Sequence, residues 1–359
     1  NIIECQLIES ALLNIINFES LIATKAFRIK MVCGDRKFSD FGLRRAQGLG
    51  AINATRAAAI GGASSTSNVF SGKLYDIPPS GTQAHSWIQS FDNELEAFRA
   101  YAFTNPENSI LLVDTYNTLR SGVPNAIRVA QEMEKEGHRL KAIRLDSGDL
   151  AYLSKKARKM LDDEGLEYVN IVASNQLNEH VIKSLLHEQN ASIDFFGVGT
   201  ELITGKDNAA LDGVYKLAEV NGKGKMKFSE NLEKVTLPGK KKVYRYFDQD
   251  GMFFRDGILL EKEDENRAEI IHHPIYPERS TTVAGLKKEA LLQKVVDEGE
   301  IFKSSLNTAD INAYLMKRSS QLPEEHKRFI SPHIYKVGIS TELLNLRETL
   351  AKSLKQKIL

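Results

Sequence analysis

The stretch AIRLDSGDL at residues 142–150 contains the three kinds of sequence that decide the fold. Its apolar start, residues 142–145, is typical of a buried β-strand. The polar residues 146–149 that follow are typical of a turn. A helical pattern then runs from residue 150 to residue 164. We therefore predict a strand, a turn and a helix, the repeating unit of a parallel sheet covered by helices.

The same unit recurs along the chain. Further apolar runs are found at residues 74–78, 110–113, 170–173 and 193–196. Helical patterns occupy residues 87–103, 120–136 and 178–188, and two earlier units, at 38–45 and 60–68, are less regular. Six or seven units in about 170 residues favour an α/β barrel over an open sheet. No Gly-x-Gly-x-x-Gly turn follows the first strand, so a dinucleotide-binding sheet is disfavoured.

The pattern divides the chain into three segments. Residues 1–35 contain an amphipathic helix, and residues 36–205 contain the barrel units. Residues 206–359 form an α+β portion, with a hairpin around residues 248–251 and helices at 285–298, 309–319 and 341–355. Because the chain begins with Asn1 rather than Met, we expect that an N-terminal segment precedes it.

Composition narrows the class of protein. Of the 359 residues, 42% are hydrophobic and 26% are charged, and the net charge is +1. This balance favours neither nucleic acid nor a membrane surface as a partner. No apolar stretch approaches the roughly 20 residues that a membrane span needs. Cys5 and Cys33 lack a metal-binding or redox spacing, which predicts two reduced thiols in a cytosolic protein.

Polar residues follow each predicted strand, and in a β/α barrel these turns meet at one face. Residues 197–200, GVGT, let backbone amides approach an oxyanion closely. Guanidinium groups suit phosphate or carboxylate, and carboxylates suit ribose hydroxyls or hydrated Mg²⁺. The turns supply both: Arg44, Arg45, Arg144, Asp114, Asp146 and Asp149. Two simpler interpretations stay open, an Arg144–Asp146 ion pair at the barrel rim and a helix N-cap at residues 146–149.

His85 lies in the turn GTQAHS, residues 81–86, and Thr82 and Ser86 are candidates to cap the helix that follows. Taken alone, a loop histidine more often packs or caps than reacts. Together with the other polar turns, His85 suits a proton shuttle, a phosphate contact or a nucleophile towards the γ-phosphate of ATP. The implied ligand has a phosphate, a polyol and an anionic or aromatic part.

Six motifs in order resemble those of the nicotinate phosphoribosyltransferase family: FGLRRAQG at 41–48, GTQAHS at 81–86, LVDTY at 112–116, RLDSGDL at 144–150, GVGT at 197–200 and GVYKL at 213–217. The resemblance implies the type II phosphoribosyltransferase fold. That fold is an irregular α/β barrel with an additional α+β sandwich domain, built here from the N- and C-terminal parts, residues 1–35 and 206–359.

The resemblance also implies an activity. Nicotinate and phosphoribosyl pyrophosphate (PRPP) would give nicotinate mononucleotide and pyrophosphate, the first step of NAD salvage from nicotinate. The reaction would be coupled to hydrolysis of ATP to ADP and phosphate through a phosphohistidine at His85. Mg²⁺ would be the cofactor, and the enzyme would be a cytoplasmic homodimer with shared active sites.

The resemblance implies catalytic roles for His85, Asp146 and Arg144. The implied substrate-binding residues are Phe41, Arg44, Ser67, Asn68, Thr82, Ser86, Asp114, Ser147, Gly148, Asn175, Gly197, Gly199 and Thr200. Among these, Gly197, Gly199 and Thr200 would hold the 5′-phosphate, and Asp114 with Asp146 would orient the ribose or the metal. Arg144 would stack on the pyridine ring opposite Phe41. Asn68 or Ser67 would donate to the carboxylate of nicotinate.

The chain departs from the family pattern at Gln83, Gln176 and Asn178, where many relatives carry histidine or acidic residues. We therefore leave the Mg²⁺ ligands unassigned. Other interpretations also remain. These are a nicotinamide or quinolinate phosphoribosyltransferase, a catalytically silent barrel that binds phosphoribosyl ligands, and a triose-type barrel acting on another sugar phosphate.

Overall fold

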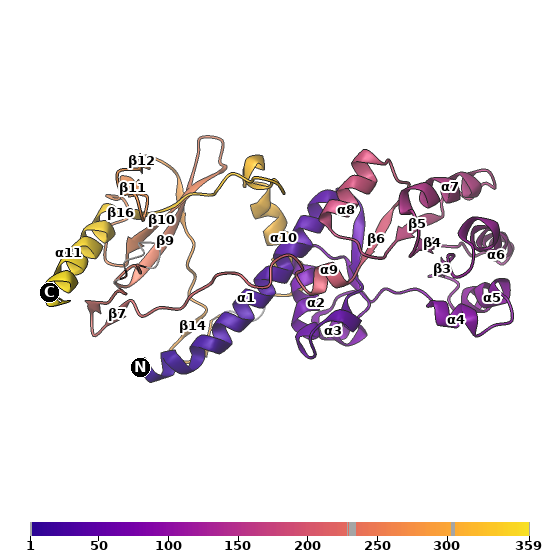
Figure 1. The fold of residues 1–359 in the computed structure, drawn as a ribbon, viewed down its shortest axis with the longest axis horizontal. Coiled ribbons are helices and arrows are strands. Elements are labelled where there is room, and N and C mark those ends of the chain that lie inside the picture. The colour runs from indigo at the N-terminus through magenta and orange to yellow at the C-terminus, as the bar shows by residue number, and fades with distance from the viewer. Residues whose placement is uncertain (1, 228, 230–234, 303–305, 359) are drawn as a thin grey trace. The chain divides into compact units, whose positions relative to one another are not determined.

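The computed structural model describes residues 2–227, 229, 235–302 and 306–358 (Figure 1). The chain divides into two compact units, Asn1–Gly213 with Asn307–Ala313 (unit 1) and Val214–Leu306 with Tyr314–Leu359 (unit 2). The first boundary falls at residue 213 rather than 205. The intervening stretch stays attached to unit 1, where the backbone N–H of Leu211 donates to Asn17 Oδ1 at 2.6 Å.

Unit 1 is built on a six-stranded parallel sheet of order β2-β1-β6-β5-β4-β3. Its strands are β1 Lys37–Asp40, β2 Ser65–Thr66, β3 Ile110–Leu112, β4 Ala142–Leu145, β5 Asn170–Ala173 and β6 Phe195–Val198. Helices connect consecutive strands, which confirms the predicted α/β class. Four of the predicted apolar runs match strands β3, β4, β5 and β6 closely.

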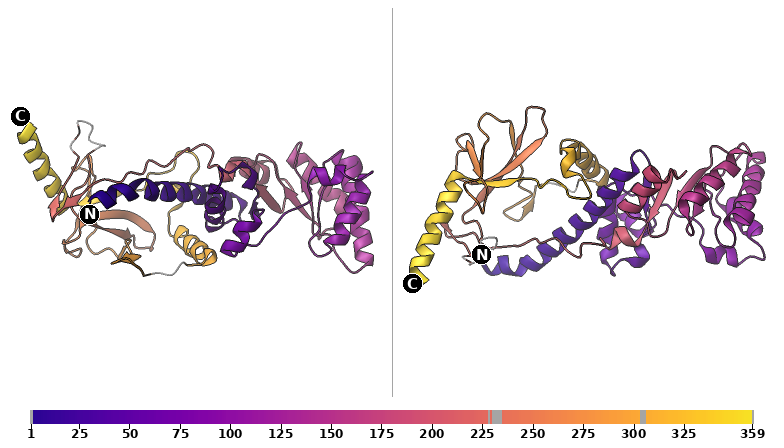
Figure 2. Two further views of the ribbon diagram at one scale, coloured as in Figure 1. Left: turned by 90° about the horizontal axis from the view of Figure 1, so that it is seen from below. Right: turned by 45° about the horizontal axis from the view of Figure 1, so that its top comes forward.

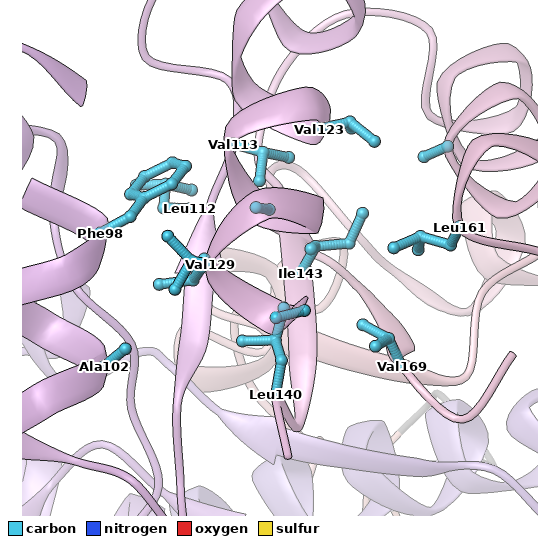
Figure 3. Packing of buried hydrophobic residues seen from close by; sticks show 14 of the residues in the cluster. Phe98, Ala102, Leu112, Val113, Val123, Val129, Leu140, Ile143, Leu161 and Val169 are labelled. Carbon is cyan, nitrogen blue, oxygen red and sulfur yellow. The ribbon is translucent and has the colours of Figure 1, made fainter. Parts of the chain in front are cut away.

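The outer face of strands β3 to β5 is covered by helices (Figures 1 and 2). The main ones are α5 Glu94–Thr104, α6 Val123–Lys135 and α7 Leu150–Asp162. Their apolar side chains, including Phe98, Val129 and Leu161, pack against Ile143 and its neighbours in a core that excludes water (Figure 3). Burial of this surface is the main source of stability for unit 1.

The opposite face of the sheet encloses a cavity of about 720 Å³. Val172 of β5 and Phe195 of β6 line it, and so does Pro79, which forms a parallel bridge with Thr66 of β2. The strands at both ends of the sheet bound the same cavity, so the sheet must curl. The curled sheet and its covering helices agree with the predicted irregular barrel.

Two predictions about the region around the histidine turn were wrong. The apolar run 74–78 is not a strand, because α3 Val69–Tyr75 takes up its start and only Pro79 bridges to the sheet. The helical pattern 87–103 is two helices, α4 His85–Gln89 and α5. The break occurs at Asn93, whose side chain accepts from the backbone N–H of Glu96 and so starts a new helix.

Helix α1 (Ile2–Cys33) belongs to unit 1, whereas the resemblance placed residues 1–35 with the sandwich domain. Its second half packs on α2 Gly50–Ile60 and α8 Glu179–Lys183. Buried Glu179 pairs with Lys25 at 2.9 Å and with Arg28 at 2.8 Å. Burial acts to raise the pKa of Glu179, but these two cations hold it below its usual value.

By length and composition alone, α1 is apolar enough to cross a membrane, and it is the one such helix among the described residues. The expectation that no apolar stretch approaches a membrane span was therefore wrong. A core helix of a soluble protein or a signal sequence can have the same length and composition.

Unit 2 contains a mixed six-stranded sheet of order β12-β11-β16-β10-β9-β13. The predicted hairpin is present as β9 Lys241–Phe247 and β10 Phe253–Leu260, with Gly251 in the turn at a φ of 79°. The other strands of this sheet are β11 Ile270–His272, β12 Ser280–Thr282, β13 Lys288–Ala290 and β16 Val337–Ser340. Two small ladders pair β7 Glu219–Val220 with β8 Lys223–Gly224, and β14 Val296–Asp297 with β15 Glu300–Ile301.

The helices predicted near the C-terminus are α10 Thr308–Ser319 and α11 Thr341–Ile358, which confirms them. The helix predicted at residues 285–298 was wrong. Strands β13 and β14 lie there instead, because Lys288–Ala290 finds hydrogen-bonding partners on the exposed edge of β9.

Candidate active site

The carboxyl ends of strands β1, β4, β5 and β6 surround a pocket of about 200 Å³, which we call the carboxyl-edge pocket. The parallel register brings these strand ends to one edge of the sheet. The pocket gathers many of the predicted site residues: Phe41, Arg44, Arg144, Asp146, Asn175, Gly197, Gly199 and Thr200. The exposed Arg45 also lines it, and neither Arg44 nor Arg45 forms an ion pair within the described ranges.

Arg144 on β4 joins three segments of unit 1. Its Nη1 donates to Thr82 Oγ1 at 2.7 Å, and its Nε donates to Ser174 Oγ at 2.8 Å. Its Nη2 donates to Asp146 Oδ1 at 2.7 Å, and Ser174 donates to the same carboxylate. The predicted ion pair is therefore present, but it is part of a wider network that fixes the guanidinium.

The network also sets the charge of Asp146. Burial acts to raise the pKa of this carboxyl, but the positive charge of Arg144 and the hydrogen bond from Ser174 outweigh burial and hold the pKa below its usual value. Asp146 is therefore ionised at neutral pH, as a group that stabilises a developing positive charge must be.

His85 is the first residue of α4, and its side chain is 41% exposed. Nδ1 lies 3.0 Å from Thr115 Oγ1, which orients the ring. Nε2 lies 3.7 Å from Asp146 Oδ2 and 4.0 Å from Asp114 Oδ1. One ring nitrogen is thus engaged by a hydroxyl, while the other is close to two carboxylates.

Asp114 follows β3, and its side chain is 1% exposed. Its Oδ2 accepts from the backbone N–H of Asp146 at 2.8 Å and from Ser147 Oγ at 2.6 Å. Its Oδ1 has no hydrogen-bond partner among the described residues. A buried acceptor without a donor is costly, so Oδ1 is available for a ligand. Ser147 therefore holds Asp114, whereas Asp149 caps α7, as one interpretation predicted.

Phe41 lies directly over Gly197. A Cβ atom at position 197 would be 2.5 Å from the Phe41 ring, so only glycine allows this approach. The ring centroid lies 5.5 Å from Arg144 Cζ. A ring stacked between two planes needs about 7 Å between them. The predicted stack of pyridine between Arg144 and Phe41 therefore requires one of these side chains to move.

Asp40, at the end of β1, is buried behind the pocket and was missed by sequence reasoning. Its Oδ1 accepts from the N–H of Gly42 at 2.8 Å, and its Oδ2 accepts from the hydroxyls of Thr55 and Thr66 at 2.9 and 3.0 Å. Burial raises the pKa of Asp40, and these three donors oppose the shift. The carboxyl ties the turns after β1 and β2 to helix α2.

Asn68 is buried beside this cluster. Its Oδ1 accepts from the N–H of Ser71 and so caps α3, and its Nδ2 donates to Thr55 Oγ1 at 3.3 Å. Ser67 is half-buried next to it. The amide of Asn68 is thus engaged inside the protein, and its contact with a substrate carboxylate stays a prediction.

Capping of α4 by Thr82 or Ser86 was a wrong prediction. The N-cap residue is Ala84, without a side-chain cap. Thr82 Oγ1 donates instead to the carbonyl of Gln83 and accepts from Arg144, and Ser86 is exposed. Asn178, one of the departures from the family pattern, caps α8.

Sequence reasoning also left Thr115 and Ser174 without a role. Both are polar residues just after apolar runs, so their position was a usable signal. Asp40 and Thr55 gave no comparable signal, because they meet only through the packing of α2 on the sheet. Asn175 and Gln176 have φ values of 83° and 49°, a left-handed conformation that is uncommon outside glycine and is often found at functional sites.

The chain is similar to proteins of known family. The family described as "Nicotinate phosphoribosyltransferase (NAPRTase) family" matches residues 36–258, and the "Nicotinate phosphoribosyltransferase C-terminal domain" matches residues 240–347. A nicotinate phosphoribosyltransferase of Bacillus subtilis is 47% identical over 351 residues, which cover 95% of this chain and 71% of that protein.

Two solved structures are also similar. The crystal structure of human nicotinic acid phosphoribosyltransferase has a TM-score of 0.85 at 30% identity, covering 96% of this chain and 77% of that one. Nicotinate-nucleotide pyrophosphorylase from Pyrococcus furiosus has a TM-score of 0.70 at 26% identity, covering 87% and 73%. Both support the predicted type II phosphoribosyltransferase-like fold.

Proposed function

Because the chain belongs to the nicotinate phosphoribosyltransferase family, we propose that its carboxyl-edge pocket joins nicotinate to PRPP and releases nicotinate mononucleotide and pyrophosphate. This is the first step of NAD salvage from nicotinate. The observation that carries the proposal for this site is the network of Arg144, Asp146 and Asp114 around His85 Nε2.

Phosphate binding is supported at the rim of the pocket. Gly197 and Gly199 line the pocket beside Thr200, which suits the 5′-phosphate. Arg44 and Arg45 are exposed cations at the same pocket, free to neutralise pyrophosphate or the nicotinate carboxylate. These side chains can bind the charged ends of both substrates without breaking an ion pair inside the described chain.

The reaction requires that both substrates be held rigidly. As the bond from ribose C1 to pyrophosphate breaks, C1 gains positive charge, and the pyridine nitrogen attacks from the other side. Ionised Asp146 places negative charge where ribose would lie, and Asp114 Oδ1 is available to accept from a ribose hydroxyl. Arg144 is held by three acceptors, so these groups need little reorganisation during the reaction.

ATP coupling is proposed at His85. When Nδ1–H donates to Thr115 Oγ1, the lone pair of Nε2 is free to attack the γ-phosphorus of ATP. The N–P bond forms as the bond to the bridging oxygen breaks, and ADP leaves. The phosphohistidine is then hydrolysed to histidine and phosphate. The exposed ring and its proximity to the pocket residues support this role.

Mg²⁺ is proposed as the cofactor, and its binding residues can be tested against the structure. No group of three or more histidine, cysteine or acidic side chains within the described part of the chain is arranged to hold a metal. Mg²⁺ is commonly held by one or two carboxylates together with substrate phosphates. The unpartnered Oδ1 of Asp114, with Asp146, fits that pattern. Bound there, the ion would neutralise charge on pyrophosphate.

A cytoplasmic homodimer with shared active sites is also proposed. The first half of α1 leaves apolar side chains exposed that a second copy could cover: Ile3, Leu7, Ile8, Leu12, Ile15 and Ile16. The free thiols of Cys5 and Cys33 suit a reducing compartment. Size measurement in solution checks the dimer.

The decisive experiment measures pyrophosphate release from PRPP with nicotinate, nicotinamide or quinolinate, each with and without ATP. We expect release with nicotinate, increased by ATP. Release only with quinolinate or nicotinamide would overturn the substrate assignment, and no release with any pyridine would favour a silent or different barrel.

A further inference from the structure

Unit 2 contains a cavity of about 980 Å³ that the reaction described above does not use. Its walls come from β10, β11, β12 and β16 and from the segment that precedes β16. Every lining residue belongs to unit 2. The volume is within the range of pockets that hold small organic ligands. We call it the basic cavity, because its charged side chains are cations.

Four permanent cations line the basic cavity: Arg255, Arg279, Arg328 and Lys336. No aspartate or glutamate of the described residues lines it. None of the four cations forms an ion pair within the described ranges. Several other cations of unit 2 are paired, as Arg245 is with Asp256 at 2.8 Å. The cavity therefore concentrates positive charge that the protein itself leaves unneutralised.

Arg255 is the deepest of these cations. It is 9% exposed, and its Nε has no hydrogen-bond partner among the described residues. Its neighbour on β10, Asp256, is unavailable because Arg245 and Tyr335 already bind it. Burial lowers the pKa of Arg255, as expected for a cation with little compensation. The guanidinium Cζ lies 4.9 Å from the centroid of the Phe254 ring, a cation–π contact that offsets only part of the cost of burial. A buried charge without a counter-ion is expensive, and an anion in the cavity would supply one.

A histidine lies beside the cations. His273 lines the cavity, and its Nδ1 accepts from the backbone N–H groups of Ile275 and Tyr276, both at 3.1 Å. A ring nitrogen that accepts must be unprotonated, so Nε2 carries the proton in the neutral ring. By contrast, both ring nitrogens of His272 are engaged, by Pro277 O and Thr341 Oγ1.

We propose that the basic cavity is a second ligand site, separate from the barrel pocket, that binds a polyphosphate chain, either inorganic or carried by a nucleoside. Four cations, one of them the buried guanidinium of Arg255, match the charge of a triphosphate better than that of a single phosphate. Arg255 anchors one phosphate group, and the exposed Arg279 and Arg328 bind the rest of the chain.

The test is a calorimetric titration of the whole protein with inorganic triphosphate. We expect two classes of site, one in the barrel and one in unit 2. In the double variant Arg279→Ala/Arg328→Ala, affinity at one class should fall about tenfold or more, while nicotinate mononucleotide synthesis is unchanged. In Arg144→Ala the other class should weaken and the cavity class should stay.

The matched control is Lys262→Ala/Arg267→Ala, which removes two exposed cations of unit 2 that do not line the cavity. This variant should bind as the wild type does. A single class of site in the wild type, an unchanged titration in the cavity variant or an equal loss in the control would each overturn the proposal.

Two further ligands, ATP and AMP, show whether the polyphosphate is inorganic or carried by a nucleoside. Tighter binding of ATP than of inorganic triphosphate at the cavity class indicates a nucleoside polyphosphate, and equal binding indicates the chain alone; both support the proposal. Equally tight binding of AMP contradicts a polyphosphate site. Arg255→Gln provides a second check, since it should weaken the same class, with thermal unfolding used to verify that the variant folds.

Discussion

His85 Nε2 lies 3.7 Å from Asp146 Oδ2, so the histidine of the 81–86 turn and the carboxylate after β4 face the same space. The two residues are 61 positions apart in the sequence. They lie in helix α4 and in the turn after β4, which are not paired with each other in a sheet. Their proximity depends on Thr115, which orients the ring, and on Arg144, which holds the carboxylate. The predictions below test whether this arrangement works as one catalytic unit.

Replacing His85 by alanine should abolish phosphoryl transfer from ATP. With γ-labelled ATP the wild type should acquire an acid-labile label, His85→Ala should acquire none, and ATP should no longer increase its rate. The control is His138→Ala. That histidine is similarly exposed and also has a polar partner, Glu107 at 2.9 Å, but it lies outside the pocket. Equal labelling of His85→Ala and the wild type would contradict the role of His85.

Replacing Arg144 by lysine should lower kcat/KM about 100-fold. Lysine keeps the charge, but one ammonium group cannot reproduce the planar fork that reaches Thr82, Ser174 and Asp146. Steady-state kinetics measures the loss. Arg139→Lys is the control, because Arg139 stacks on Tyr168 with its Cζ 4.8 Å from the ring centroid, away from the pocket. A change no greater than that of the control would show that charge alone matters.

Replacing Gly197 by alanine should displace the Phe41 ring. The added Cβ would lie 2.5 Å from that ring. Loss of an aromatic contact of about 1 kcal/mol corresponds to a rise of about fivefold in KM for nicotinate. Gly81→Ala is the control, since a Cβ there meets nothing within 4 Å. An unchanged KM in Gly197→Ala would mean that Phe41 does not contact the pyridine.

Replacing Asn68 by aspartate should raise kcat/KM for nicotinamide relative to nicotinate, because an acceptor replaces a donor. Aspartate can still cap α3. Thermal stability should fall as well, because the Thr55 hydroxyl already donates to Asp40 and cannot also donate to a new carboxylate. Asn93→Asp, at another N-cap asparagine, is the control. The same substrate ratio in Asn68→Asp and the wild type would reject a specificity role.

Acid should destabilise the wild type more than Asp146→Asn. The pKa of Asp146 is lower in the folded protein than in the unfolded chain, because Arg144 and Ser174 outweigh the effect of burial. Its charged form therefore contributes stability above the usual aspartate pKa of about 4, and this contribution is lost as pH falls below that value. Urea unfolding between about pH 5 and pH 3 measures the difference. Asp163→Asn, in an exposed pair with Lys159, should behave as the wild type does.

The parts of the fold that could be predicted are those in which local sequence and burial agree. Residues 142–145 and 170–173 are mainly apolar, flanked by turns and largely buried in the sheet, and both are strands with those bounds. β2 was harder, because Ser65–Thr66 is short and polar and owes its place to pairing with β1. The strand at 288–290 depends in the same way on the free edge of β9.

The site was predictable as a set of turns but not as a network. Each polar residue after a strand could be found from its position, and several of these residues line one pocket, whereas Thr82, His85 and Asp114 do not. The hydrogen-bond partner of each residue could not be predicted. Ser147 binds the side chain of Asp114, and Asp149 caps a helix. Asn68 caps a helix and also binds a side chain, although all three are typical turn or cap residues. Such choices depend on distances across the sheet, which one sequence does not contain.

The bridge between Thr66 and Pro79 has a consequence for association between molecules. β2 would otherwise end the sheet with an open edge, and open edges recruit strands from other chains. Thr66 instead exchanges hydrogen bonds with Pro78 O and with the N–H of Ser80. The outward side of that added segment presents Pro79, which has no N–H to offer. The segment that leads to His85 therefore also protects the sheet from edge-to-edge aggregation.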